Sequence, residues 1–106
     1  MSEVVVVARA RMKAGKEEAA EAALREVMPP THQESGCSRY ALHRGIEDRQ
    51  TFVMIERWES KESLDTHLAT EHVQTLFAKL GDLVEAPPEI LVLDPLSDAL
   101  GAKGRL

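Results

Sequence analysis

Apolar and polar positions along the first third of the chain predict a strand, a turn and an amphipathic helix. The β-branched segment 4–12 begins with four consecutive valines and predicts a strand, and Gly15 supplies the turn after it. From about Lys16 the apolar side chains recur every three or four residues, which is the spacing of a helix with one buried face. Pro29 and Pro30 are expected to stop or kink this helix, because proline lacks the amide proton that a helix needs.

The remaining pattern predicts three strands and a second helical region. Residues 37–44 and 51–59 alternate in polarity around a polar turn and predict a hairpin, and residues 89–93 predict the last strand. Ser60 is a plausible N-cap for the helical region, in which Thr70 marks a second cap or a break. A helical stripe of apolar residues then continues from Glu71 to near Glu85, before the next proline pair.

The predicted order is β-α-β-β-α-β, the α+β pattern of a ferredoxin-like antiparallel sheet with both helical regions on one face. Right-handed crossovers give the strand order 4-1-3-2. Residues 1–96 are expected to form this domain, and residues 97–106 a flexible or partner-contacting C-terminal tail.

Both faces of the predicted sheet are apolar. Consecutive apolar residues in strands 4–12, 51–59 and 89–93 point alternately to the two faces, and helices can cover only one of them. A large exposed apolar face is not tolerated in a soluble monomer. We therefore expect a homodimer that forms through the sheet face opposite the helices.

Composition narrows the possible partners and compartments. The 106 residues are 43% apolar and 29% charged, with a net charge of −5 and no basic patch, so nucleic-acid binding is not expected. No apolar run is long enough for a membrane span, and no signal peptide is visible. Cys37 is the only cysteine and is expected to be a small buried side chain rather than a nucleophile. The cytoplasm is the default location.

A few polar groups interrupt apolar positions and are candidates for chemistry. Glu56 shares a strand face with Met54 and Trp58, so it either lines a pocket with Trp58 or pairs with an arginine while Trp58 fills the core. His67 and His72 lie near the apolar side of the second helical region, and imidazole titrates near neutral pH. Each is either an acid-base group or a hydrogen-bonded structural histidine.

Other candidates and cofactors are less favoured by the spacing. His43, on the second strand, is a third candidate histidine, with Arg39 and Arg44 nearby to bind an anionic oxygen. His67 and His72 would be about 140° apart around a continuous helix, and no His-Glu-x-x-His motif occurs, so no metal site is expected. No glycine-rich phosphate loop is present for a nucleotide or flavin, and we expect no cofactor.

Three short motifs together resemble the antibiotic biosynthesis monooxygenase family, and most closely its small quinol monooxygenase branch. The similarity covers roughly residues 4–93, and the motifs that carry it are Glu34-x-Gly36-Cys37, Glu56-x-Trp58-x-Ser60 and His67-x-x-x-x-His72. The resemblance implies a dimeric α+β barrel. It also implies oxidation of a small aromatic substrate by O₂ without metal, flavin or nucleotide.

The resemblance also suggests roles for individual residues. His67 or His72 would be the catalytic base, and Glu56 would orient the base or the substrate. The substrate would be bound by the following side chains: Tyr40, His43, Phe52, Met54, Trp58, Leu64 and Phe77.

Departures from the family pattern leave alternatives open. Met54 and Leu64 replace the asparagine and tyrosine of anthrone-oxidising members, and Ala8 and Phe77 differ from the haem-degrading relatives. An isomerase acting on a small carbonyl or signalling metabolite in the same pocket, or a non-catalytic dimeric binding module, remains possible.

Overall fold

Four strands and three helices follow one another in the predicted β-α-β-β-α-β order, with the second helical region divided in two. The computed structural model describes residues 2–106. Its elements are β1 (Val4–Arg11), α1 (Glu17–His32), β2 (Cys37–Arg44), β3 (Thr51–Trp58), α2 (Lys61–Leu68), α3 (Glu71–Leu80) and β4 (Glu89–Leu93), followed by the 3₁₀ turns η1 (Asp98–Leu100) and η2 (Ala102–Gly104). None of the helices in residues 2–106 is both long and apolar enough to cross a membrane.

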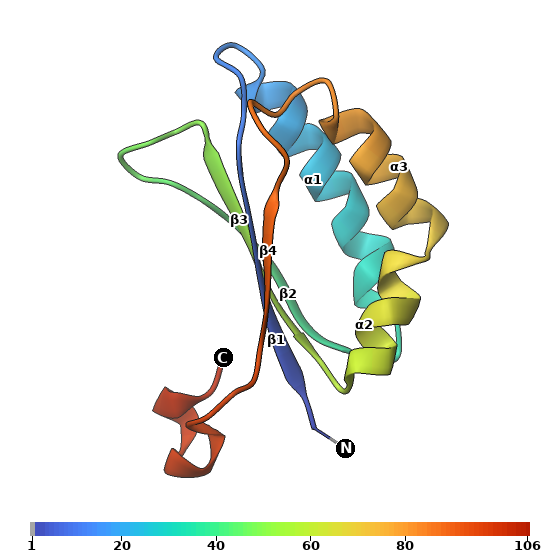
Figure 1. Cartoon of the computed structure of the whole chain (residues 1–106), viewed down its shortest axis with the longest axis vertical. Coiled ribbons are helices and arrows are strands. Elements are labelled where there is room, and N and C mark those ends of the chain that lie inside the picture. The colour runs from blue at the N-terminus through green and yellow to red at the C-terminus, as the bar shows by residue number, and fades with distance from the viewer. Residues whose placement is uncertain (1) are drawn as a thin grey trace.

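The strands form one antiparallel sheet in the order β2-β3-β1-β4, which is the predicted order counted from the other edge. Val6 on β1 lies opposite Glu56 on β3 and Val92 on β4. Because side chains alternate along a strand, these even-numbered positions share one face. The three helices cover that face (Figure 1). The layered α+β fold predicted from the sequence is therefore confirmed.

The core lies between the helices and the sheet. It combines even-numbered side chains of the strands with the inward stripes of the helices, as their periodicities predict. Its buried members are Val6, Met12, Ala20, Ala23, Leu24, Val27, Tyr40, Phe52, Met54, Trp58, Leu64, Val73, Leu76 and Leu80.

The prolines do not stop the first helix, and the last helix ends earlier than predicted. Helix α1 continues through Pro29 and Pro30 and ends at His32. The prolines lie in its last turns, and the carbonyls that lose an amide partner belong to exposed residues, where water can bind them. Helix α3 ends at Leu80 instead of near Glu85, because the amide of Glu85 donates to the carbonyl of Arg11 at 2.9 Å and extends the pairing of β1.

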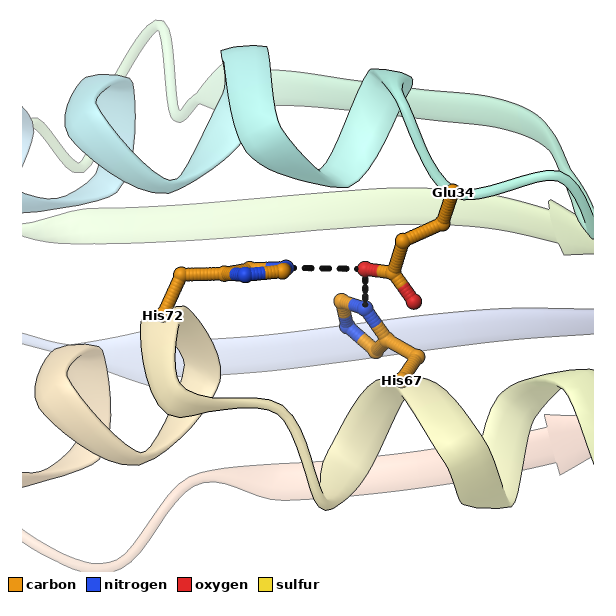
Figure 2. A group of neighbouring side chains, drawn as sticks. All are labelled: Glu34, His67 and His72. Atoms are coloured by element: carbon orange, nitrogen blue, oxygen red, sulfur yellow. Dashed lines mark hydrogen bonds and ion pairs between the residues drawn. The ribbon is translucent and has the colours of Figure 1, made fainter.

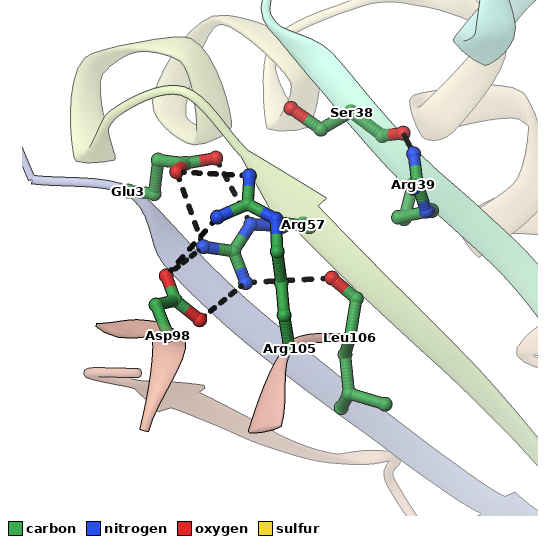
Figure 3. Close-up of polar contacts among 7 residues, drawn as sticks. All are labelled: Glu3, Ser38, Arg39, Arg57, Asp98, Arg105 and Leu106. Carbon is green, nitrogen blue, oxygen red and sulfur yellow. Dashed lines mark hydrogen bonds and ion pairs between the residues drawn. The ribbon is translucent and has the colours of Figure 1, made fainter. Parts of the chain in front are cut away.

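The C-terminal tail folds back over the sheet face that the helices leave open (Figure 1). The guanidinium of Arg57, on β3, is almost fully buried and binds the carboxylates of Glu3 and Asp98 and the carbonyl of Leu106 (Figure 3). Arg105 reaches the same two carboxylates. The tail thus contacts its own sheet through these ion pairs, and its leucine side chains point into solvent.

Strand β4 forms one edge of the sheet and is exposed along its whole length. Its four apolar residues, Ile90 to Leu93, keep between 40% and 47% of their surface accessible. Within the described part of the chain only β1 pairs with β4, so the outer edge of β4 offers unpaired backbone groups to solvent.

Candidate functional site

An apolar cavity lies between the sheet and the helices. It has a volume of about 90 Å³. Five of the predicted substrate-binding side chains line it: Tyr40, Phe52, Met54, Leu64 and Phe77. Phe77 on α3 and Ile90 on β4 line the cavity and are also 40% and 46% exposed, so the mouth opens between these two elements. Such a cavity suits a small and largely apolar ligand.

Glu56 brings a carboxyl group into this apolar wall. It lies on β3, is only 6% exposed, and its Oε1 accepts a hydrogen bond from Nε1 of Trp58 at 2.9 Å. Burial raises the pKa of Glu56 to about 7; the charge of Glu34 acts in the same direction, while the Trp58 hydrogen bond lowers it. Glu56 therefore pairs with Trp58 rather than with an arginine, and its carboxyl group titrates near neutral pH.

Trp58 does not line the cavity but packs against His67, which does. Its side chain is fully buried, and its ring lies 4.4 Å from the ring of His67, with an angle of 38° between the planes. Tyr40 meets Trp58 edge-on, with 6.4 Å between ring centroids. Burial raises the pKa of Tyr40, so its hydroxyl stays protonated. These contacts fix the imidazole of His67 in position.

His67, on α2, lines the cavity and contacts Glu34 with one of its ring nitrogens. Nδ1 of His67 lies 2.8 Å from Oε2 of Glu34, whereas Nε2 has no hydrogen-bond partner among the described residues. Because Glu34 favours a proton on Nδ1, Nε2 of the neutral ring carries a free lone pair. Burial lowers the pKa of His67, and the hydrogen bond to Glu34 opposes that change. His67 is thus a candidate base.

His72 reaches the same carboxylate oxygen from the next helix. Its Nε2 lies 2.8 Å from Oε2 of Glu34 (Figure 2). The two histidines can converge because the helical region breaks at Thr70, whose hydroxyl accepts from the amide of Val73 and caps α3. The estimate of 140° around one helix is therefore wrong, since His67 and His72 belong to different helices.

Of the three neighbouring residues Glu34, His67 and His72, Glu34 is the one that was not identified as a candidate from the sequence. It lies in the short loop between α1 and β2, far from both histidines along the chain. The one available signal is its place in the motif Glu34-x-Gly36-Cys37. Gly36 brings this loop against the first turn of α2, where a Cβ atom at position 36 would lie 2.5 Å from Cβ of Ser63.

Gly36→Ala is expected to lower the free energy of unfolding by about 1–3 kcal/mol, the usual cost of overpacking a close contact. Thermal or urea unfolding measures this change. Gly81→Ala is the matched control, because the nearest atoms to its added Cβ lie at an ordinary 3.6 Å. Equal stabilities of the two variants would contradict the close contact of this loop with α2.

His43 and Arg44 do not line the cavity. His43 projects from the other face of the sheet and is exposed, with Nδ1 near the carbonyl of Ala41. Arg44 binds the carbonyl of Arg49 and the carboxylates of Glu18 and Glu21. His43 therefore cannot contact a ligand in this cavity.

Cys37 is partly buried beside the core. Burial raises the pKa of its thiol to about 11, with the charges of Glu34 and Glu56 adding to the effect. The side chain stays a neutral thiol near pH 7, which is unfavourable for a nucleophile.

Comparisons with known proteins bear on what this site does. The family model described as "Antibiotic biosynthesis monooxygenase" matches residues 3–79, more than half of the chain. The chain is 34% identical over 98 residues to "Putative monooxygenase Rv0793" of Mycobacterium tuberculosis, covering 92% of this chain and 96% of that protein. "Putative monooxygenase YcnE" of Bacillus subtilis is 27% identical, with 83% and 93% covered.

Solved structures show the same similarity in three dimensions. The structure of Rv0793 superposes with a TM-score of 0.85 at 33% identity, covering 90% of this chain and 96% of that chain. The structure of PA3566 from Pseudomonas aeruginosa gives a TM-score of 0.85 at 30% identity, covering 91% and 96%. The similarity thus extends over at least 90% of the chain in both structures.

Proposed function

Because the chain belongs to the antibiotic biosynthesis monooxygenase family, we propose that it oxidises a small quinol or related electron-rich aromatic with O₂ and needs no bound cofactor. The names of its relatives support a monooxygenase-type function in general. The observation that carries the finer proposal is an apolar cavity lined by His67, whose Nε2 has no hydrogen-bond partner among residues 2–106.

Different cavity residues bind the substrate and accept its proton. Apolar side chains such as Phe52 and Met54 contact a flat ring and exclude water. Nε2 of His67 accepts the proton of a substrate hydroxyl, and Glu34 stabilises the imidazolium that results. The oxygen of Glu56 that does not bind Trp58 is available for a second substrate hydroxyl.

The substrate itself supplies every electron that this reaction needs. The quinolate passes one electron to O₂, and the semiquinone and superoxide combine at a ring carbon to form a hydroperoxide. Loss of water then leaves the hydroxyquinone, so one oxygen atom ends in the product and the other in water. The quinol loses four electrons in total, and no external reductant enters the balance.

The proposed active form is a homodimer that joins the open sheet faces. Val7, Val53 and Ile55 are partly exposed on that face, and Leu91 and Leu93 are 45% and 40% exposed. Together they form an apolar surface next to the folded tail, of the kind that a soluble protein covers by association.

Ile55→Glu is expected to convert this dimer into a monomer at micromolar concentration, because the new carboxylate would lose its hydration in the interface. Sedimentation velocity measures the change. Ala22→Glu, on the exposed side of α1, serves as the control and should leave the dimer intact. A native protein that already sediments as a monomer would contradict the dimer.

The proposed activity is tested by O₂ uptake with an oxygen electrode. Metal-free protein is mixed with benzoquinols, naphthoquinols and catechols, and the rate is corrected for spontaneous autoxidation. Uptake above background that is unaffected by a chelator, with one hydroxyquinone formed per O₂, is expected. Product formed without O₂ uptake would point to an isomerase, and binding without turnover to a binding module; either result would refute the monooxygenase.

A further inference from the structure

We propose that Glu34, His67 and His72 form a binding site for a first-row divalent metal ion such as Zn²⁺. Each residue comes from a different element, the α1–β2 loop, α2 and α3, and their side chains point toward one another (Figure 2). One carboxylate oxygen and two imidazole nitrogens lie within 4.8 Å of one another. The fold thus assembles two neutral nitrogen ligands and one anionic oxygen ligand at one place.

The donor set selects the class of ion. Two imidazoles and one carboxylate suit Zn²⁺, Co²⁺, Ni²⁺ or Fe²⁺, whereas Mg²⁺ and Ca²⁺ prefer oxygen ligands. Zinc binds histidine nitrogen at about 2.0–2.1 Å and carboxylate oxygen at about 2.0–2.2 Å. Nδ1 of His67 and Nε2 of His72 each lie 2.8 Å from Oε2 of Glu34, so the three ligand atoms have to move apart to admit an ion. His72 has the most room to adjust, since 24% of its side chain is exposed.

The groove between α1 and α3 gives an ion a route from solvent to this site. It is lined by His72 and by the carboxylates of Glu26 and Glu71. Lys79 also lines the groove and pairs with Glu26 at 2.6 Å, which leaves the carboxylate of Glu71 to attract a cation. An ion therefore approaches from the outer side of the helices and does not cross the apolar cavity.

Metal binding would also change the protonation of Nε2 of His67, a residue that lines the cavity. A metal ion needs the lone pair of Nδ1, which now contacts Glu34. The proton of the neutral ring then moves through solvent to Nε2, and the ring keeps one proton in total. A base that accepts at Nε2 is thereby blocked, so the ion acts as an inhibitor; this part rests on the proposed function.

Calorimetric titration with Zn²⁺ and the visible absorption of bound Co²⁺ test the site without any assay of activity. One ion per chain is expected for the native protein. Glu34→Gln and His72→Asn should each weaken binding by at least about 100-fold, because each removes a direct ligand. His43→Asn removes an exposed histidine on the other sheet face and should bind as the native protein does.

Separate outcomes decide the site and its effect on activity. Absence of binding at 100-fold excess of Zn²⁺ over protein, or equal affinity in all three variants, would overturn the site. Binding that leaves O₂ uptake unchanged would overturn the inhibition alone. A protein that consumes no O₂ with any quinol contradicts the proposed function, while the calorimetric and Co²⁺ results still decide the metal site.

Discussion

His67→Asn is expected to lower kcat for quinol-dependent O₂ uptake by about 10²–10⁴-fold, the usual contribution of a positioned general base. Asparagine can still donate a hydrogen bond from near the place of Nδ1 to Glu34, but it has no atom at the place of Nε2. The variant therefore removes proton transfer while keeping the contact that holds α2 to the loop of Glu34.

The matched control is His43→Asn, which makes the same change on the other face of the sheet. It should keep the native kcat, because position 43 does not line the cavity. Unfolding curves for both variants separate a loss of chemistry from a loss of folded protein. A folded His67→Asn variant with native kcat would exclude His67 as the base.

Glu56→Gln should stabilise the protein above neutral pH. Folding raises the pKa of Glu56 to about 7 from its ordinary 4.5, mainly by burial. The native state therefore binds the proton more tightly than the unfolded state does. The stability from this group is fully present below pH 4.5 and is lost as the pH rises through about 7. Glutamine cannot ionise, so it avoids that loss.

The expected gain in the free energy of unfolding is about 3 kcal/mol at pH 8, and much smaller at pH 5. Urea unfolding of both proteins at the two pH values measures it. Glu59→Gln, at an exposed position one residue beyond β3, should show no such pH-dependent gain. If the Glu56→Gln variant is less stable than the native protein at pH 8, the conclusion that folding raises the pKa of Glu56 is wrong.

Local patterns were sufficient to predict the fold and part of the cavity wall. Alternation along a strand decides which face a side chain joins, and Tyr40, Phe52 and Met54 therefore reach the cavity as expected. The same rule places His43 on the opposite face. Trp58 shares the face of Met54 but lies at the end of β3, beneath His67 of α2. Alternation along a strand predicts which face of the sheet a side chain joins, but it does not predict what the side chain packs against there.

The group around Glu34 was less accessible to sequence reasoning. Its geometry depends on a helix break at Thr70 and on a loop that contacts α2 through Gly36. Neither feature produces an apolar period, so the pattern contained no signal for the contact. The ion pairs of Arg57 with Glu3 and Asp98 were not predicted either, because these residues come from near the two ends of the chain and the contacts produce no apolar period.

The exposed edge of β4 also bears on aggregation. Four consecutive apolar residues on an unpaired edge can template the addition of a strand from another molecule. Here the strand has only five residues, with Pro87 and Pro88 just before it and Pro95 shortly after. Prolines offer no amide proton, so a foreign strand cannot extend its pairing far in either direction. The short proline-bounded strand thus limits uncontrolled assembly at this edge of the sheet.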